Sequence, residues 1–94
     1  MPYAFTVTEV FATVTTVATG ATLLTIDINE AGTTIISTKI TLDASEKTSR
    51  TAATAPVISD SSLANSAVMT IDIDAVGNTT TGKGLKVYIV GYQT

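Results

Sequence analysis

The sequence predicts an all-β domain in which several short strands form a sandwich or a barrel. Threonine accounts for 20 of the 94 residues. Thr, Val and Ile favour the pleated surface of a sheet because branching at Cβ restricts χ1. Apolar and polar residues alternate over short runs, and turn signals containing glycine separate those runs. The sequence has no sustained apolar period of 3.6 residues, so we expect little helix.

The first predicted strand lies within Tyr3–Ala18 and contains a change of phase. Tyr3, Phe5 and Val7 alternate in one phase, and Val10, Ala12 and Val14 alternate in the other. Strand side chains alternate between the two faces with a period of two. The change of phase therefore requires a bulge or a bend, which we place at Thr8–Glu9.

The second predicted strand lies within residues 21–29 and leads into a hairpin. Its inward residues are apolar from Leu24 to Ile28, which puts Asp27 and Asn29 on the opposite, outward face. The segments predicted after it are a hairpin loop at residues 30–33 and extended chain at 34–37 and 39–42.

The middle of the chain is mostly polar, and two alternatives remain open for its first turn. Asp43 and Glu46 have the spacing of a capping box, which would begin one helical turn. A polar turn without helix accounts equally well for the same residues. Leu63 is the apolar residue that the later loop is expected to bury. The remaining predicted segments are a polar edge strand at 48–54, an apolar strand at 57–59 and a loop at 60–66.

Two strands close the sequence, and the first of them repeats an earlier pattern. Thr25–Asn29 (TIDIN) recurs as Thr70–Asp74 (TIDID), so these strands could lie side by side or in facing sheets. A loop is predicted at residues 77–83. The expected inward residues are Met69, Ile71 and Ile73 in the strand 68–76, and Leu85, Val87, Ile89 and Gly91 in the strand 85–92.

Two motifs begin like ligand-binding loops without meeting their requirements. Gly77–Lys83 matches the start of a phosphate-binding P-loop, but Gly84 stands where Ser or Thr should hold Mg²⁺, and a strand follows instead of a helix. Asp72–Asp74 begins like a calcium loop, yet Val76 and Lys83 occupy later ligand positions. We therefore expect neither nucleotide nor calcium to bind.

A cation site is one alternative for the acidic residues of the repeated strands. If those strands pair, Asp27, Asn29, Asp72 and Asp74 would bring four oxygen-bearing side chains to one face. The interpretation we favour is that these residues solvate an exposed strand face and discourage edge pairing. We predict no metal site and no cofactor.

Composition excludes several classes of function. A chain of 94 residues and 9.7 kDa is one domain, residues 1–94, and 45% hydrophobic residues exclude a disordered chain. Without Cys or His, the chain cannot use thiol or histidine catalysis. The net charge of −3 argues against binding to nucleic acid or anionic membrane. We expect no enzyme, no signal peptide and no membrane span.

Apolar residues on outward positions are the candidate binding residues. Tyrosine is favoured at contacts because it is large and stiff and has a polar tip. Ordinary core or half-exposed packing is the alternative. The predicted interface residues are Phe5, Phe11, Tyr88 and Tyr92.

Six motifs span nearly the whole chain: TIDINEAGTTIISTKITL at 25–42, DASEKTS at 43–49, TAATAPVISD at 51–60, MTIDID at 69–74, VG at 76–77 and GKGLKV at 82–87. Together they resemble a β-domain of tailed-bacteriophage virion structural proteins. The resemblance implies a jelly-roll-like antiparallel β-sandwich that often associates as a trimer. One departure is Asn65–Ser66, where sequences of that family commonly carry acidic residues.

The resemblance implies a non-enzymatic structural role in the virion, assembled in the cytoplasm of the bacterial host. A capsid decoration, or cement, protein that stabilises the head shell is the first expectation. The alternative is a tail-fibre or tail-tip module for trimerisation or for binding host-surface glycans. A small glycan-binding lectin is a third class, although three Tyr and two Phe supply little aromatic platform. The expected partners are the major capsid protein or another virion protein, and further copies of the chain.

Overall fold

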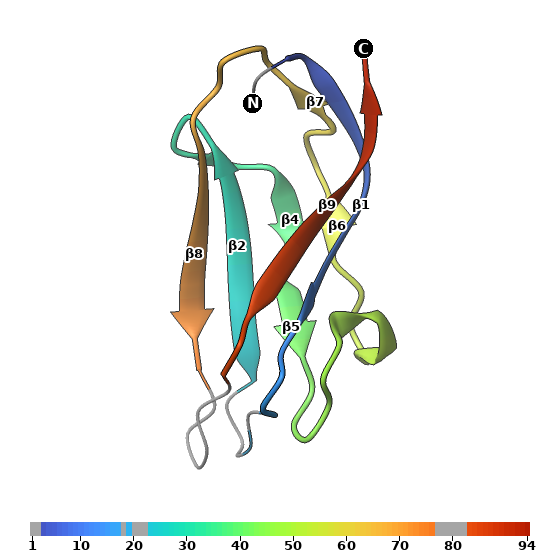
Figure 1. Ribbon diagram of the computed structural model, residues 1–94, viewed down its shortest axis with the longest axis vertical. Coiled ribbons are helices and arrows are strands. Elements are labelled where there is room, and N and C mark those ends of the chain that lie inside the picture. Colours follow the sequence, from blue (N-terminus) through green and yellow to red (C-terminus); the bar gives the residue numbers. More distant parts are fainter. Residues whose placement is uncertain (1–2, 18, 20–22, 77–82) are drawn as a thin grey trace.

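A computed structural model describes residues 3–17, 19, 23–76 and 83–94 of the chain (Figure 1). The described part contains strands, one short 3₁₀ turn and no α-helix, so the prediction of an all-β chain with antiparallel sheets is confirmed. None of its helical segments has the length and apolar character needed to cross a membrane. The elements are β1 (Phe5–Thr13), β2 (Leu24–Glu30), β3 (Thr33–Thr34), β4 (Ile36–Thr38), β5 (Ile40–Leu42), η1 (Ser49–Thr51), β6 (Val57–Ile58), β7 (Ser62–Leu63), β8 (Met69–Ala75) and β9 (Lys86–Gln93).

The first sheet has the order β7-β1-β9, with β1 in the centre. Val7 pairs with Gly91 and Glu9 with Val90, so Thr8 is the extra residue of a β-bulge and the predicted bulge is confirmed. The two strands approach closely beside it. A Cβ atom added to Gly91 would lie 1.9 Å from the backbone carbonyl oxygen of Thr6. Only glycine fits at that position.

The second sheet is built around β2, which pairs with β3 and β5 along one edge and with β8 along the other. The predicted hairpin joins β2 to β3 through Ala31 and Gly32, whose φ angles are 49° and 86°. Positive φ angles at both central residues are typical of the type I′ turn, whose twist matches that of the two strands it joins. Of the two placements considered for the repeated strands, the structure has the side-by-side one, with β2 and β8 antiparallel.

The polar middle of the chain corrects one prediction and decides another. Residues 48–54 form no edge strand, because the Thr48 hydroxyl accepts a hydrogen bond from the Arg50 backbone N–H and begins the η1 turn. Hydroxyl side chains often compete with strand pairing in this way. Residues 43–46 form a polar turn without helix, closed by the Glu46 N–H donating to the Asp43 carbonyl. Beyond η1, β6 pairs with β4.

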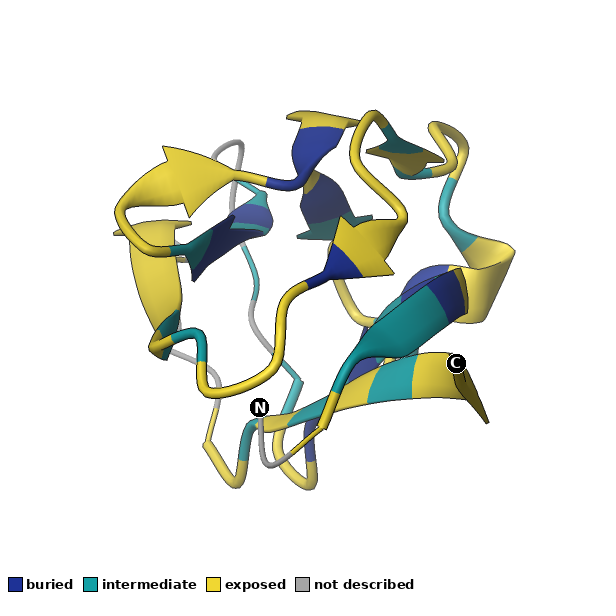
Figure 2. Cartoon of the chain, turned by 90° about the horizontal axis from the view of Figure 1, so that it is seen from above, coloured by how far each residue is buried: buried dark blue, intermediate teal, exposed yellow. Residues whose placement is uncertain are grey.

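One apolar cluster joins the strands of both larger sheets. Leu63 belongs to it with 1% of its surface exposed, so its predicted burial is confirmed, but it lies on β7 rather than in the loop expected at residues 60–66. Figure 2 shows the buried segments turned toward the space between the sheets and the exposed segments around the periphery. The buried apolar residues are Val7, Val10, Ala12, Val14, Leu24, Ile26, Ile28, Ile35, Ile36, Ile40, Leu42 and Leu63.

Burial along β2 and β8 departs from the sequence expectation. Ile71 and Ile73 share a face with buried residues of β2, as predicted, yet 43% and 53% of their surfaces are exposed. Conversely, Asp27 and Asn29 were expected on an exposed face, and they are only 8% and 7% exposed. The reason is position in the sheet, because among the described residues β2 has strands along both edges whereas β8 has a strand along one.

Candidate functional site

The outer side of the first sheet carries an aromatic face, which we define as Phe11, Tyr88, Val90 and Tyr92. Phe11 on β1 is paired in register with Tyr88 on β9. Their rings stack with centroids 4.5 Å apart and planes inclined by 10°. Tyr88, Val90 and Tyr92 are exposed, with Tyr92 the most exposed of the three at 58%. The face therefore offers a stiff aromatic surface outside the core cluster.

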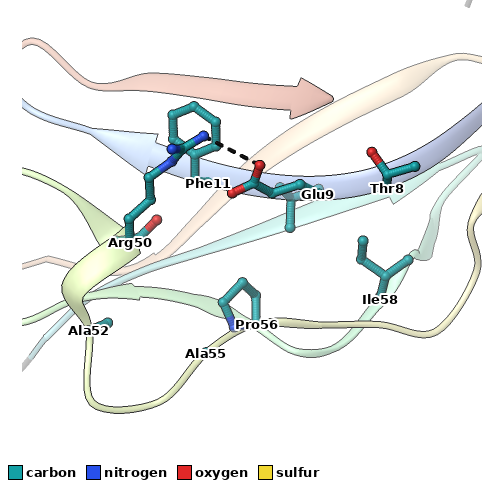
Figure 3. A pocket seen from close by; sticks show the side chains of 10 residues that line it. Thr8, Glu9, Phe11, Arg50, Ala52, Ala55, Pro56 and Ile58 are labelled. Carbon is teal, nitrogen blue, oxygen red and sulfur yellow. Dashed lines mark hydrogen bonds and ion pairs between the residues drawn. The ribbon is translucent and has the colours of Figure 1, made fainter. Parts of the chain in front are cut away.

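Arg50 extends this face from the neighbouring η1 turn. Its guanidinium carbon lies 4.0 Å from the centroid of the Phe11 ring, and its Nη2 lies 3.3 Å from Oε1 of Glu9 (Figure 3). Contact between a guanidinium and an aromatic ring is favourable because the ring face is electronegative. The exposed ion pair with Glu9 contributes little to stability, and its main effect is to orient the guanidinium.

The η1 turn is fixed to β1 by a buried hydrogen bond. The Ala12 backbone N–H donates to the Ser49 hydroxyl oxygen at 2.9 Å, and Ser49 is almost completely buried. On the same edge of β1, the Val14 N–H donates to the Lys47 carbonyl. Backbone groups alternate between strand edges, so Val10 also directs its N–H and carbonyl to this edge.

A pocket of about 400 Å³ lies between that edge of β1 and the segment that follows η1. Small and apolar side chains form much of its wall (Figure 3). Among the described residues that line it, the charged ones are Glu9 and Arg50, which pair with each other. A wall of this composition suits contact with an extended polypeptide or with an apolar group. It suits acid–base chemistry less, because its two charged residues neutralise each other. The lining residues are Thr8, Glu9, Val10, Phe11, Ser49, Arg50, Ala52, Ala55, Pro56 and Ile58.

The structure brings three of the four predicted interface residues to one face. Phe11, Tyr88 and Tyr92 lie on the aromatic face, whereas Phe5 packs against the core on the other side of the sheet. The ring of Phe5 has Tyr3 as an aromatic neighbour, with centroids 6.2 Å apart. The bulge at Thr8 separates the two phenylalanines. Odd-numbered residues of β1 point toward the core before the bulge, as Phe5 does, and away from it after the bulge, as Phe11 does.

The acidic residues of β2 and β8 come together, but protein groups already occupy their oxygens. Asn29 Nδ2 donates to Asp72 Oδ2 at 2.8 Å, the Thr34 hydroxyl donates to Asp27, and Lys39 forms an ion pair with Asp74. That ion pair raises the pKa of Lys39, aided by the nearby charges of Asp27 and Asp72. Within the described residues, no group of three or more acidic side chains could hold a metal ion.

Sequence reasoning missed Arg50 and the degree of exposure along β8. Arg50 is 41 positions from its partner Glu9, and no local pattern connects them. The exposed apolar residues on and beside β8 are Val68, Ile71, Ile73 and Val76. The P-loop-like motif at 77–83 falls outside the described residues except for Lys83, which forms a β-bridge with Thr16.

Comparisons of the chain with models of protein families, with curated proteins and with solved structures found no match.

Proposed function

We propose that this chain is a non-enzymatic structural protein of a tailed-bacteriophage virion, and specifically a capsid decoration protein that stabilises the head shell. The sequence motifs that resemble phage β-domains suggest the virion. The observation that carries a binding role is the aromatic face, where Tyr88, Val90 and Tyr92 are exposed and do not belong to the core cluster. Exposed apolar surface of this kind usually marks a contact.

For the fold, we propose a jelly-roll-like antiparallel β-sandwich formed by a single domain. Its support is the shared cluster, in which inward residues of β1 and of β2 pack together from two different antiparallel sheets. Two sheets whose inner faces share one core are typical of sandwiches.

The proposed partner of the aromatic face is the major capsid protein or another virion protein, in the virion assembled in the host cytoplasm. A net charge of −3 gives little electrostatic attraction. The attachment then depends on apolar burial and shape, which salt screens weakly. We propose that the attached form is a homo-oligomer, and that this oligomer is a trimer. We propose neither nucleic acid nor membrane as a partner.

Counting copies in purified particles tests this proposal. A decoration protein should be present in hundreds of copies per particle and should stay bound at about 0.5 M salt. A few tens of copies or fewer would favour the alternative, a tail-fibre or tail-tip module. The exposed Tyr88 and Tyr92 support the glycan-binding form of that alternative, because aromatic surfaces suit sugar rings.

Paired variants test the aromatic face itself. Tyr92→Ser, alone and combined with Val90→Ser, should reduce the number of bound copies. Val57→Ser is the matched control, because Val57 is 51% exposed but lies on β6. Equal occupancy for all three variants would contradict attachment through this face.

A further inference from the structure

The two strands that carry most of the exposed apolar residues each have an unpaired edge. Within the described residues, β8 pairs only with β2, and β9 pairs only with β1. An unpaired edge presents backbone N–H and C=O groups that can pair with another chain. The strands have seven and eight residues, which is enough for an extended ladder.

The inner faces along these free edges are incompletely covered. Ile71 and Ile73 lie opposite Ile28 and Ile26 of β2, yet they are about half exposed, whereas the β2 residues are fully buried. On β9, the inward Val87 and Ile89 are only partly buried against the core. A further strand along either edge would cover apolar surface as well as satisfy backbone groups.

We propose that β8 of one copy pairs antiparallel with β9 of a second copy, giving a closed head-to-tail homo-oligomer. This inference rests on the oligomer contained in the proposed function. The two-residue alternation permits a register in which every inward residue of β8 meets an apolar residue. In that register, Met69, Ile71 and Ile73 lie opposite Ile89, Val87 and Leu85 of the second copy.

Charge complementarity favours β9 of the second copy, rather than its β8, as the strand that pairs with the free edge of β8. Pairing β8 with another β8 would gather the carboxylates of Asp72 and Asp74 from both copies on one face. In the proposed register, Asp72 instead lies directly opposite Lys86 of the second copy. Neither residue forms an ion pair within the described part of its own chain, and directly opposite charges on paired strands attract.

Head-to-tail pairing has a consequence for assembly. Each contact uses a β8 edge of one copy and a β9 edge of the next, so an open row would leave one edge of each kind unpaired at its ends. A ring removes both free edges. The proposed trimer is such a ring, and its mass would be about three times the 9.7 kDa of one chain.

Cysteine crosslinking tests the inference, because the natural chain has no cysteine. In the proposed register, Val68 lies opposite Val90 of the second copy, and both residues are exposed. Val68→Cys and Val90→Cys are prepared as separate proteins, checked for folding by circular dichroism, mixed and mildly oxidised. We expect crosslinked dimers in the mixture well above the level in either protein alone. Thr33→Cys mixed with Val90→Cys is the control, since Thr33 is exposed on β3.

Three results would overturn the inference. Crosslinking of either single variant with itself as strongly as in the mixture would show pairing of like strands. An internal crosslink in a monomeric Val68→Cys/Val90→Cys double variant would show that one chain closes its own edges. Crosslinking at the Thr33 control level, with a monomer by light scattering, would show no pairing.

A monomer that still decorates particles would overturn this inference alone, whereas an oligomer that fails to bind particles would overturn the proposed function alone.

Discussion

β2 and β8 have nearly the same sequence and opposite surroundings. Each contains the sequence Thr-Ile-Asp-Ile, and the two strands lie side by side in one sheet. Ile26 and Ile28 of β2 are completely buried, whereas Ile71 and Ile73 of β8 are 43% and 53% exposed. The alternating pattern therefore determines which face a side chain occupies, and the number of neighbouring strands and layers determines how deeply it is buried.

The polar residues of the two strands show the same contrast. Asp27 and Asn29 are buried and hydrogen-bonded to Thr34 and Asp72, whereas Asp72 and its neighbours on β8 remain exposed. Buried polar groups are tolerated when they have such partners. Position in the sheet has thus made one copy of the pattern structural and left the other available for contacts.

Alanine substitution of one paired isoleucine from each strand should separate the two environments most strongly. Ile26 lies directly opposite Ile73, so the pair is matched in residue type and location. Ile26→Ala should lower the free energy of unfolding by about 2–5 kcal/mol because it leaves a cavity. Ile73→Ala should lower it by about 1 kcal/mol, because roughly half of that side chain is already in water.

Urea unfolding of both variants, at protein concentrations where the chain is monomeric, measures this difference. Equal losses at those concentrations would mean that the monomer covers Ile73, and the contrast between β2 and β8 would then be wrong.

The buried carboxylate of β2 should matter more than an exposed one of β8. Asp27→Ala should cost about 1–3 kcal/mol, because Asp27 accepts a hydrogen bond from Thr34 in a buried site. Asp74→Ala removes only an exposed ion pair with Lys39 and should have a clearly smaller effect. Thermal unfolding at neutral pH compares the two, and a greater loss from Asp74→Ala would reverse the predicted order.

Local patterns predicted those parts of the fold that depend on neighbouring residues. The bulge at Thr8 followed from a change of phase, and the hairpin at Ala31–Gly32 followed from its turn residues. The strand expected at 48–54 failed because the Thr48 side chain caps a 3₁₀ turn, and propensity alone does not reveal that competition. Burial depth along β8 depends on which strands lie beside it, which alternation does not encode.

The candidate site was predictable to a similar extent. Alternation along the last strand placed Tyr88 and Tyr92 on its outer face, and the bulge explains why Phe11 joins them and Phe5 does not. The contact of Arg50 with Phe11 arises only when η1 is fixed to β1 by Ser49, through a hydrogen bond that spans 37 positions. Contacts of that range follow from the folded topology.

Charge reversal on β8 and β9 tests whether these edge strands, unlike the central strand β2, pair with a second copy. Asp72→Lys or Lys86→Asp should each weaken self-association roughly tenfold, since each replaces an attractive pair with a repulsive one. The double variant should recover the lost affinity. Lys47→Asp is the control, because it makes the same charge change as Lys86→Asp at an exposed site away from both strands. Sedimentation at several concentrations measures the association, and failure of the double variant to recover would contradict the Asp72–Lys86 contact.

The smallest expected effect concerns Lys39, whose ion pair with Asp74 links the surroundings of β2 to β8. This hydrogen-bonded pair raises the pKa of Lys39 in the folded chain. A raised folded-state pKa means that the contribution to stability is complete below the ordinary lysine pKa of about 10.4 and is lost as the pH rises through the raised value. Stability should therefore fall slightly more steeply in this alkaline range for the natural chain than for Lys39→Met. Urea unfolding at a series of alkaline pH values measures both slopes. Parallel slopes would mean that the pair is too well solvated to join the two strands energetically.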